Sequence, residues 1–319
     1  MPNIWITWEN QRRNKGISLA LDWPLHELLF HEPRIIRYPL SIFRTIKLIR
    51  KNRPRILAVQ NPSIVLAVLA LVMRNFFNYR TIIDAHNAGI YPSEGRSPVL
   101  NAISRWIQKK ADLTIVTNQE LKSVVEGNGG KAFVLPDRLP SVPEIKTSPL
   151  GDEGFNVVFV CTYSTDEPYE EVFKAAGMVS KNVRIYVTGK YPSKISPTSL
   201  PSNIKLLGYV SEDNFWSLLS SADLIMDLTL REGCLVCGAY EGVSLLKPLI
   251  LSDTKILRSY FSEGCVYVAP NAESISAGIN LAINHIEAMK TGIRHLKTKL
   301  EKTWECTLQD LKRTIEEIK

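Results

Sequence analysis

Short runs of apolar, β-branched residues recur along the chain, and a helical pattern of apolar positions follows each of them. Runs such as Val157–Val160 are apolar at every position, which is typical of strands buried on both faces of a parallel sheet. Strands that alternate with helices predict an α/β fold with two doubly wound parallel sheets. The expected strands are Asn3–Trp8, Arg34–Tyr38, Ile56–Gln60, Thr81–Asp84, Leu113–Thr117 and Ala132–Leu135 in the first half, and Asn156–Cys161, Val183–Thr188, Ile204–Leu207, Leu224–Leu228, Pro248–Leu251 and Cys265–Val268 in the second.

Three helices can be placed with the same reasoning. Ser97 is a suitable N-cap and Pro98 a suitable first helical residue, and apolar positions then repeat at helical spacing. These positions are Leu100, Ile103 and Ile107. The ten apolar residues Ile64–Met73 predict a buried helix, because a membrane-spanning helix needs about 20. The charge-rich segment Ile286–Lys319 predicts a long C-terminal helix.

Proline and glycine are dense between the two halves, in Leu135–Pro143 and in Ser148–Gly154. This density predicts a linker with a domain boundary near residues 140–153. We assign residues 1–145 to an N-terminal, acceptor-binding domain and residues 146–319 to a C-terminal, nucleotide-sugar-binding domain. The C-terminal helix can pack back on the N-terminal domain.

The net charge is uneven along the chain. Residues 1–150 hold 21 Lys+Arg and 11 Asp+Glu, a net charge of +10, whereas residues 151–319 have a net charge of −3. A basic half predicts an anionic partner, either an anionic membrane or a diphosphate-linked acceptor. Nucleic acid also fits the charge, but the chain has no Gly-Phe RNA-binding signature and no zinc-finger spacing, so we expect no nucleic acid.

The sequence around Met1–Trp5 lacks a basic region followed by an apolar one, so we expect no secretory signal and a cytoplasmic protein. The segment Ser41–Arg55 predicts an amphipathic helix with a basic face. This face either lies on anionic lipid at the inner surface of the membrane or is a solvated face over an ordinary core.

The five cysteines are scattered, which is typical of reduced thiols. Cys234 and Cys237 form a lone CxxC without a second pair of ligands, and no Asp-x-Asp follows a strand. We therefore expect no metal site and no redox function.

The segment after the expected strand Leu224–Leu228 carries the strongest chemical signal. Gly233 and Gly238 bracket a small-residue loop that enters a helix. A helix N-terminus exposes N–H groups that suit a diphosphate, and glycine lets phosphate approach the backbone. Glu241, one turn inside the helix, can accept both ribose hydroxyl protons, and Glu232 can meet the sugar. The alternative is a helix-capping loop with solvated carboxylates.

This segment resembles the donor-site motif of family-4-like GT-B glycosyltransferases. That family has a Glu-Gly near the sugar, a small-residue turn, a glutamate on the ribose and a Lys-Pro before the next strand, as at Lys247-Pro248 here. The family usually has seven residues between its two glutamates, whereas eight separate Glu232 from Glu241.

Other segments resemble the same group of enzymes. Thr188–Pro192 and Asp166-Glu167 are similar to segments of the β-mannosyltransferase of the dolichol pathway, and Leu207–Glu212 is similar to the base-binding turn of the family. Many family-4 enzymes have a Gly-rich, phosphate-holding loop where this chain has Thr162–Pro168. The acids there either cap a helix or match the mannosyltransferase. The donor-binding residues we expect are Ser164, Gly189, Lys190, Tyr209, Val210, Arg231, Gly233, Cys237, Gly238 and Glu241.

Candidate catalytic residues of the first half follow the expected strand Thr81–Asp84. Asp84 can act as a base on an acceptor hydroxyl, or His86 can orient or protonate a group near the diphosphate. Family members carry a similar His-Asn or His-Asp, which the resemblance places beside the reacting sugar. The alternative is a capping aspartate and a structurally satisfied histidine. We take Asp84, His86 and Glu232 as catalytic candidates. The acceptor-binding candidates are Glu9, Arg12, Arg13 and Glu94.

The resemblance implies a GT-B fold, with two Rossmann-like domains that face each other across a cleft. It also implies transfer of a sugar from a nucleotide diphosphate sugar, with UDP or GDP as the nucleotide, and no cofactor beyond that substrate. The acceptor is expected to be a hydroxyl of a lipid-linked or cell-surface polysaccharide precursor. Two alternatives stay open, a sugar-nucleotide 2-epimerase and a catalytically silent GT-B subunit that binds a partner enzyme.

Overall fold

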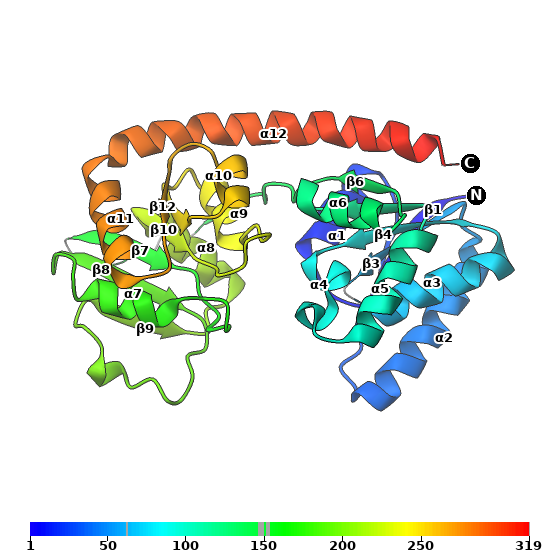
Figure 1. Cartoon of the computed structure of the whole chain (residues 1–319), viewed down its shortest axis with the longest axis horizontal. Coiled ribbons are helices and arrows are strands. Elements are labelled where there is room, and N and C mark those ends of the chain that lie inside the picture. Colours follow the sequence, from blue (N-terminus) through cyan, green and yellow to red (C-terminus); the bar gives the residue numbers. More distant parts are fainter. Residues whose placement is uncertain (62, 146–149, 151–153, 319) are drawn as a thin grey trace. The chain divides into compact units, whose positions relative to one another are not determined.

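The computed structural model describes residues 1–61, 63–145, 150 and 154–318, which divide into two compact units (Figure 1). Unit 1 comprises Met1–Arg138 and Thr303–Lys319, and unit 2 comprises Leu139–Lys302. Residues 146–149 and 151–153 of the expected linker lie outside the described residues.

Unit 1 contains a parallel six-stranded sheet whose strand order is β2-β1-β3-β4-β5-β6. The strands are β1 (Asn3–Thr7), β2 (Leu25–Glu27), β3 (Ile56–Asn61), β4 (Arg80–Ala85), β5 (Leu113–Val116) and β6 (Ala132–Val134). The helices are α1 (Arg12–Ala20), α2 (Arg34–Asn52), α3 (Ile64–Phe77), α4 (Asn87–Ile90), α5 (Pro98–Lys110) and α6 (Gln119–Gly127), with a 3-10 turn, η1, at Pro92–Gly95.

Successive residues of the buried strands of unit 1 pack on opposite faces of the sheet. Leu57 and Val59 join one apolar core, whereas Ile56 and Ala58 join the other. This alternation follows from the two-residue period of a strand, and helices cover both faces (Figure 1). Every residue of β3 is buried, which explains why its first four residues, Ile56–Val59, are all apolar.

The strand expected at Arg34–Tyr38 is wrong, because these residues form the first turns of α2. The neighbouring position in the sheet is taken by the three-residue β2, which the pattern did not predict. Ser41, Thr45 and Ile49 are buried at a spacing of four residues, which is a helical period, whereas the apolar pair Ile35-Ile36 is exposed. Local β-propensity was therefore overridden by the packing of a longer helix.

Unit 2 contains a second parallel sheet of six strands, in the order β12-β11-β10-β7-β8-β9. The strands are β7 (Phe155–Phe159), β8 (Val183–Thr188), β9 (Ile204–Gly208), β10 (Leu224–Asp227), β11 (Leu249–Ser252) and β12 (Cys265–Val268). The helices are α7 (Tyr169–Ala176), α8 (Glu212–Ser221), α9 (Cys237–Ser244), α10 (Lys255–Tyr260) and α11 (Ala272–Asn284), with a 3-10 turn, η2, at Pro197–Ser199. All six expected strands of this half are confirmed to within two residues at each end.

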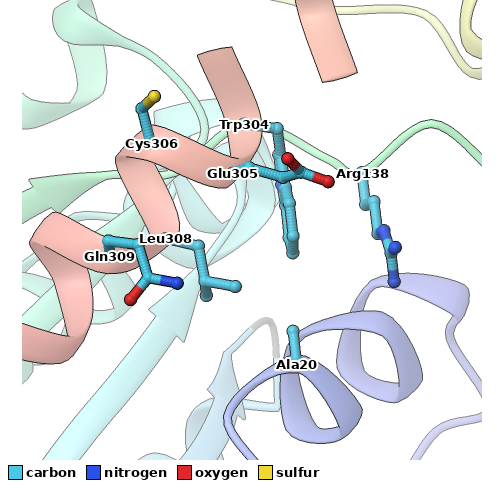
Figure 2. Close-up of a pocket in the computed structure, with 7 residues that line it drawn as sticks. All are labelled: Ala20, Arg138, Trp304, Glu305, Cys306, Leu308 and Gln309. Carbon is cyan, nitrogen blue, oxygen red and sulfur yellow. The ribbon is translucent and has the colours of Figure 1, made fainter. Parts of the chain in front are cut away.

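Helix α12 (Ile286–Glu316) is shared by the two units. Its earlier apolar residues, such as Ile293 and Leu296, pack in the core of unit 2. From Thr303 onward the helix belongs to unit 1, where Trp304 is buried and its indole N–H donates to the carbonyl of Pro136 at 3.1 Å. Trp304 also lines an open surface pocket of unit 1 that none of the expected site residues reach (Figure 2).

The other expected helices are confirmed. Helix α5 begins at Pro98, and the hydroxyl of Ser97 accepts a hydrogen bond from the backbone N–H of Leu100. The apolar run from Ile64 forms most of α3. In the part of the chain that the structure describes, we find no helix with the length and apolarity that crossing a bilayer requires.

Candidate functional site

The strand order of unit 2 reverses direction between β7 and β10. These two strands are neighbours, but the chain leaves β7 toward β8 on one side and leaves β10 toward β11 on the other. Such a reversal point, at the carboxyl ends of parallel strands, is where doubly wound folds bind ligands. The two loops that flank it are residues 160–168 after β7 and residues 228–236 after β10.

Asp166 joins these two loops. Its carboxylate accepts hydrogen bonds from the hydroxyls of Ser164 at 2.5 Å and Thr229 at 3.2 Å. Nε of Arg231 lies 3.2 Å from Oδ2 of the same carboxylate, and the backbone carbonyl of Asp166 accepts from the N–H of Leu230 at 2.6 Å. Two of the expected donor residues, Ser164 and Arg231, are thus brought together by an acid.

Glu167 occupies the backbone pocket of the β7 loop. Its Oε2 accepts from the N–H groups of Thr162 and Ser164, both at 2.9 Å, and its Oε1 accepts from the hydroxyl of Thr162 at 3.0 Å. Successive N–H groups of this kind form an anion-binding concavity. Of the two alternatives for these acids, capping of the next helix does not hold for Glu167, because its carboxylate binds the amides of its own loop and the N-cap of α7 is Pro168. An internal carboxylate therefore fills the loop where family-4 enzymes are expected to hold phosphate.

Asp227, at the end of β10, supports the start of α9. Its Oδ2 accepts from the backbone N–H of Gly238 at 2.7 Å, and the aspartate is buried. Burial raises the pKa of Asp227 well above its usual value, and the charge of Glu241 adds to this effect. Gly238 is required here, because a β-carbon would lie 2.7 Å from Oδ2 of Asp227 and 2.9 Å from Val160.

We expect Asp227→Asn to alter how stability depends on pH. An acid whose pKa is raised by folding stabilises the folded state fully below its unfolded pKa of about 4, and this contribution is lost as pH rises through the folded pKa. Asparagine has no titrating proton at this position. The free energy of unfolding of the variant should therefore rise relative to that of the wild type as the pH increases from 4.5 to 8. Urea unfolding at several pH values measures the difference.

The matched control for this titration is Asp213→Asn, which removes a carboxylate from the exposed first turn of α8. Its difference from the wild type should stay nearly constant over the same pH range. A constant difference for Asp227→Asn would contradict the proposed titration of Asp227.

The remaining expected donor residues lie mainly on the surface of unit 2. Arg231 and Glu232 are exposed, Gly233 is half-buried and Cys237 is exposed at the first position of α9. Glu241, in the second turn of α9, is only 6% exposed. Lys190 is exposed directly after Gly189, the first residue beyond β8, and Tyr209 and Val210 follow β9, at the edge of the sheet. Exposed residues therefore flank the loop that begins at Gly233, whereas the loop itself is half-buried up to Leu235 and buried at Val236.

In unit 1, Arg13 and Asp84 form a buried ion pair. Nε and Nη2 of Arg13 both lie 2.9 Å from Oδ1 of Asp84, and the two side chains are 3% and 0% exposed. Nη1 of Arg13 contacts Asp137 at 2.7 Å and the carbonyl of Leu135 at 2.9 Å. Burial alone would lower the pKa of Arg13, but the charges of Asp84 and Asp137 outweigh it and raise that pKa. Neither Arg13 nor Asp84 is placed to touch a ligand.

Glu9 and His86 lie at the carboxyl ends of β1 and β4. Glu9 is exposed, and its Oε2 accepts from the side-chain amides of Gln11 at 3.1 Å and Gln60 at 3.3 Å. Gln60 belongs to β3, the neighbour of β1, and the chain reverses direction between these two strands just as it does in unit 2. Nε2 of the half-buried His86 has no hydrogen-bond partner among the residues that the structure describes.

Two other candidates of unit 1 lie apart from these residues. Glu94 is exposed and pairs with Arg96, and Arg12 is exposed at the start of α1. Asp227, Thr229 and Gln60 are polar residues of the two reversal points that were not among the expected site residues. Each of them lies within two residues of the carboxyl end of a strand, which is the signal that could have identified them.

Comparison with known proteins connects this geometry to a fold. No family model matches the sequence, and no curated protein matches it. Among solved structures, the sucrose-phosphate synthase of Thermosynechococcus elongatus is similar with a TM-score of 0.77 at 13% identity, over 100% of this chain and 99% of that one. HepE of Anabaena, in complex with UDP and glucose, gives a TM-score of 0.77 at 12% identity, over 99% of this chain and 100% of that one.

A Listeria monocytogenes protein assigned as a UDP-N-acetylglucosamine 2-epimerase is also similar, with a TM-score of 0.61 at 12% identity over 92% of this chain and 90% of that one. The chain has the GT-B fold. The expected fold class is thereby confirmed, and the same fold occurs in proteins named for different reactions. The described residues contain no group of three or more His, Cys, Asp or Glu that could hold a metal ion.

Proposed function

We propose that this protein is a glycosyltransferase that moves a sugar from a nucleotide diphosphate sugar to a hydroxyl acceptor. The observation that supports this most is the reversal point of unit 2. There the half-buried glycine loop at Gly233, the exposed Arg231 and the start of α9 follow the carboxyl end of β10, the neighbour of β7. This place and these residue types suit a nucleotide diphosphate.

In the proposed complex, Arg231 and the N-terminal turn of α9 hold the diphosphate, with Lys190 as a second cation. Val236, the N-cap of α9, makes no side-chain cap, but the carboxylate of Asp227 already accepts from the N–H of Gly238 in this turn, so the diphosphate must use the other amides or replace that contact. Asp166 already pairs with Arg231, so the diphosphate must share or replace that contact. Glu241 accepts the ribose hydroxyls, Glu232 meets the sugar, and Tyr209 and Val210 lie toward the base. UDP and GDP are the nucleotides we propose.

Unit 1 supplies the acceptor side in this proposal. Of the two catalytic candidates Asp84 and His86, we assign the role to His86. Nε2 of its half-buried ring has no hydrogen-bond partner among the described residues, whereas the charge of Asp84 is balanced by Arg13. Glu9, Gln60 and Arg12 are the polar residues offered to a hydroxyl-bearing, phosphate-linked acceptor. A lipid-linked or surface-polysaccharide precursor has this chemistry.

Glu241→Gln tests the donor site. If the carboxylate accepts ribose hydroxyls, its loss removes charged hydrogen bonds worth about 1.5–3 kcal/mol, so UDP or GDP should bind about 10- to 100-fold more weakly. Isothermal titration calorimetry with each nucleotide measures the affinity. The control is Glu287→Gln, which removes the same charge from an exposed position on α12 and should leave the affinity unchanged.

Two results would redirect this proposal. If the wild type binds neither UDP, GDP nor their sugars, the silent-subunit alternative replaces the enzyme. Epimerisation is the second candidate function, since a protein assigned to that reaction shares the fold. Incubation with UDP-N-acetylglucosamine alone separates the two reactions, because an epimerase converts this compound without an acceptor and the proposed transferase does not.

A further inference from the structure

The positive charge of the N-terminal half comes from one continuous stretch of sequence. Residues 34–83 hold ten Lys+Arg and not a single Asp or Glu. The rest of residues 1–150 holds equal numbers of basic and acidic residues, so this stretch carries the whole net charge of +10. It contains α2 and α3, which pack against each other in unit 1 (Figure 1).

Helix α2 has a buried side and an outer side. Ser41, Thr45 and Ile49 make up the buried side. Ile36 and Phe43 are seven residues apart, so they share one face, and the helical period places that face opposite Thr45. Ile36 is 56% exposed and Phe43 is 63% exposed. Together with Ile35, which is 88% exposed, they place three large apolar side chains in solvent on one helix.

Exposed cations follow Phe43 along the same helix. Arg44, Lys47, Arg50 and Lys51 are all exposed in the second half of α2, and Arg50 continues the face of Ile36 and Phe43 at the next interval of seven residues. Neither α2 nor α3 contains an acidic residue that could pair with them. We call the side chains of Ile36, Phe43, Lys47 and Arg50, which lie together opposite Thr45, the α2 face.

We propose that the α2 face docks unit 1 on an anionic membrane surface. Apolar side chains of an interfacial helix enter the boundary between headgroups and acyl chains, while lysine and arginine bind the lipid phosphates. The α2 face offers both parts on one helix. The proposal goes beyond the transfer reaction and does not depend on nucleotide binding, although a lipid-linked acceptor would be met at the same surface.

Two other occupants fit the α2 face less well. A second copy of the chain, related by a two-fold axis, would bring Lys47 and Arg50 of both copies together, and like charges in contact are unfavourable. A nucleic acid would satisfy the cations but would leave Ile36 and Phe43 in water. A bilayer with anionic headgroups satisfies the cations and the apolar side chains together.

Co-sedimentation with vesicles tests the proposal on the whole chain. The wild type should pellet with vesicles of phosphatidylcholine and phosphatidylglycerol at low salt, and should stay in solution with phosphatidylcholine alone. Lys47→Glu/Arg50→Glu should weaken binding by about 25-fold or more, since each cation near an anionic surface contributes about five-fold. Ile36→Ser/Phe43→Ser should weaken it as well, and should do so at high salt too.

The matched control is Lys181→Glu/Lys205→Glu, which makes the same charge change at exposed positions of unit 2 and should bind vesicles more like the wild type. Circular dichroism shows whether each variant is folded. Nucleotide binding, measured separately, tests the proposed donor site independently of the vesicles. Absence of wild-type binding to anionic vesicles would overturn the proposal. So would equal binding by both α2 variants, or a dimer in gel filtration that Phe43→Ser dissociates.

Discussion

Arg13→Met is expected to lower the free energy of unfolding by about 3–5 kcal/mol. The variant removes the cation and leaves Asp84, which is 0% exposed, as a buried charge without its main partner. Breaking a buried pair in this way is costly, because the remaining ion has lost its hydration without any compensation. Urea unfolding followed by far-UV circular dichroism measures the change.

Two further variants show whether this loss comes from the uncompensated charge. Arg13→Met/Asp84→Asn removes both charges and should recover most of the stability. Asp137→Asn should cost no more than about 1 kcal/mol, because its side chain is 30% exposed and Arg13 keeps Asp84 as a partner. If the double variant is as unstable as Arg13→Met, the buried charge is not the cause.

The same variants bear on which residue acts on the acceptor. Asp84 lies near the carboxyl end of β4, two residues before His86. The sequence alone does not distinguish an aspartate that meets a substrate from one that meets an internal cation. The partner is 71 positions away, at Arg13. We expect activity of Asp84→Asn to fall together with stability, whereas His86→Ala should lose activity while it stays folded.

The sheets could be predicted because burial acts on every residue of a strand. β3 and β11 are buried throughout, so most of their residues are apolar. The expected strand at Arg34–Tyr38 failed because local β-propensity carries little weight when a helical period of buried residues continues for several turns. β2 has only three residues, none of them fully buried, so it left no pattern to detect.

The candidate site was predictable in its place and less so in its contacts. The loop at Gly233 and the helix that carries Glu241 lie where the glycine spacing indicated. Which acids meet which cations could not be predicted, because Asp166 and Arg231 are far apart in the chain and meet only through the adjacency of β7 and β10. Glu167 binds backward to the amides of its own loop, although its position before a helix favours a cap.

Gly189→Ala is expected to lower the free energy of unfolding by about 3–4 kcal/mol, from the strain of a left-handed alanine plus overpacking. Gly189 has a φ of +91°, and a β-carbon there would overlap the carbonyl oxygen of Cys161 and lie 3.2 Å from Cα of Thr162. Both of those atoms are backbone and belong to the loop that Glu167 organises. The loop must therefore move, and nucleotide binding should weaken in the fraction of the variant that is still folded.

Gly208→Ala separates the two causes of this loss. Gly208 also has a left-handed backbone, with a φ of +69°, but a β-carbon there would meet no atom within 4 Å. Its substitution should cost only the backbone term, about 1–2 kcal/mol, and should leave the β7 loop in place. Urea midpoints of the two variants, with calorimetric titration of UDP and GDP at 20 °C, give the comparison. Equal losses would mean that the close approach of Gly189 to Cys161 does not hold this loop, and that the proposed donor site depends on other contacts.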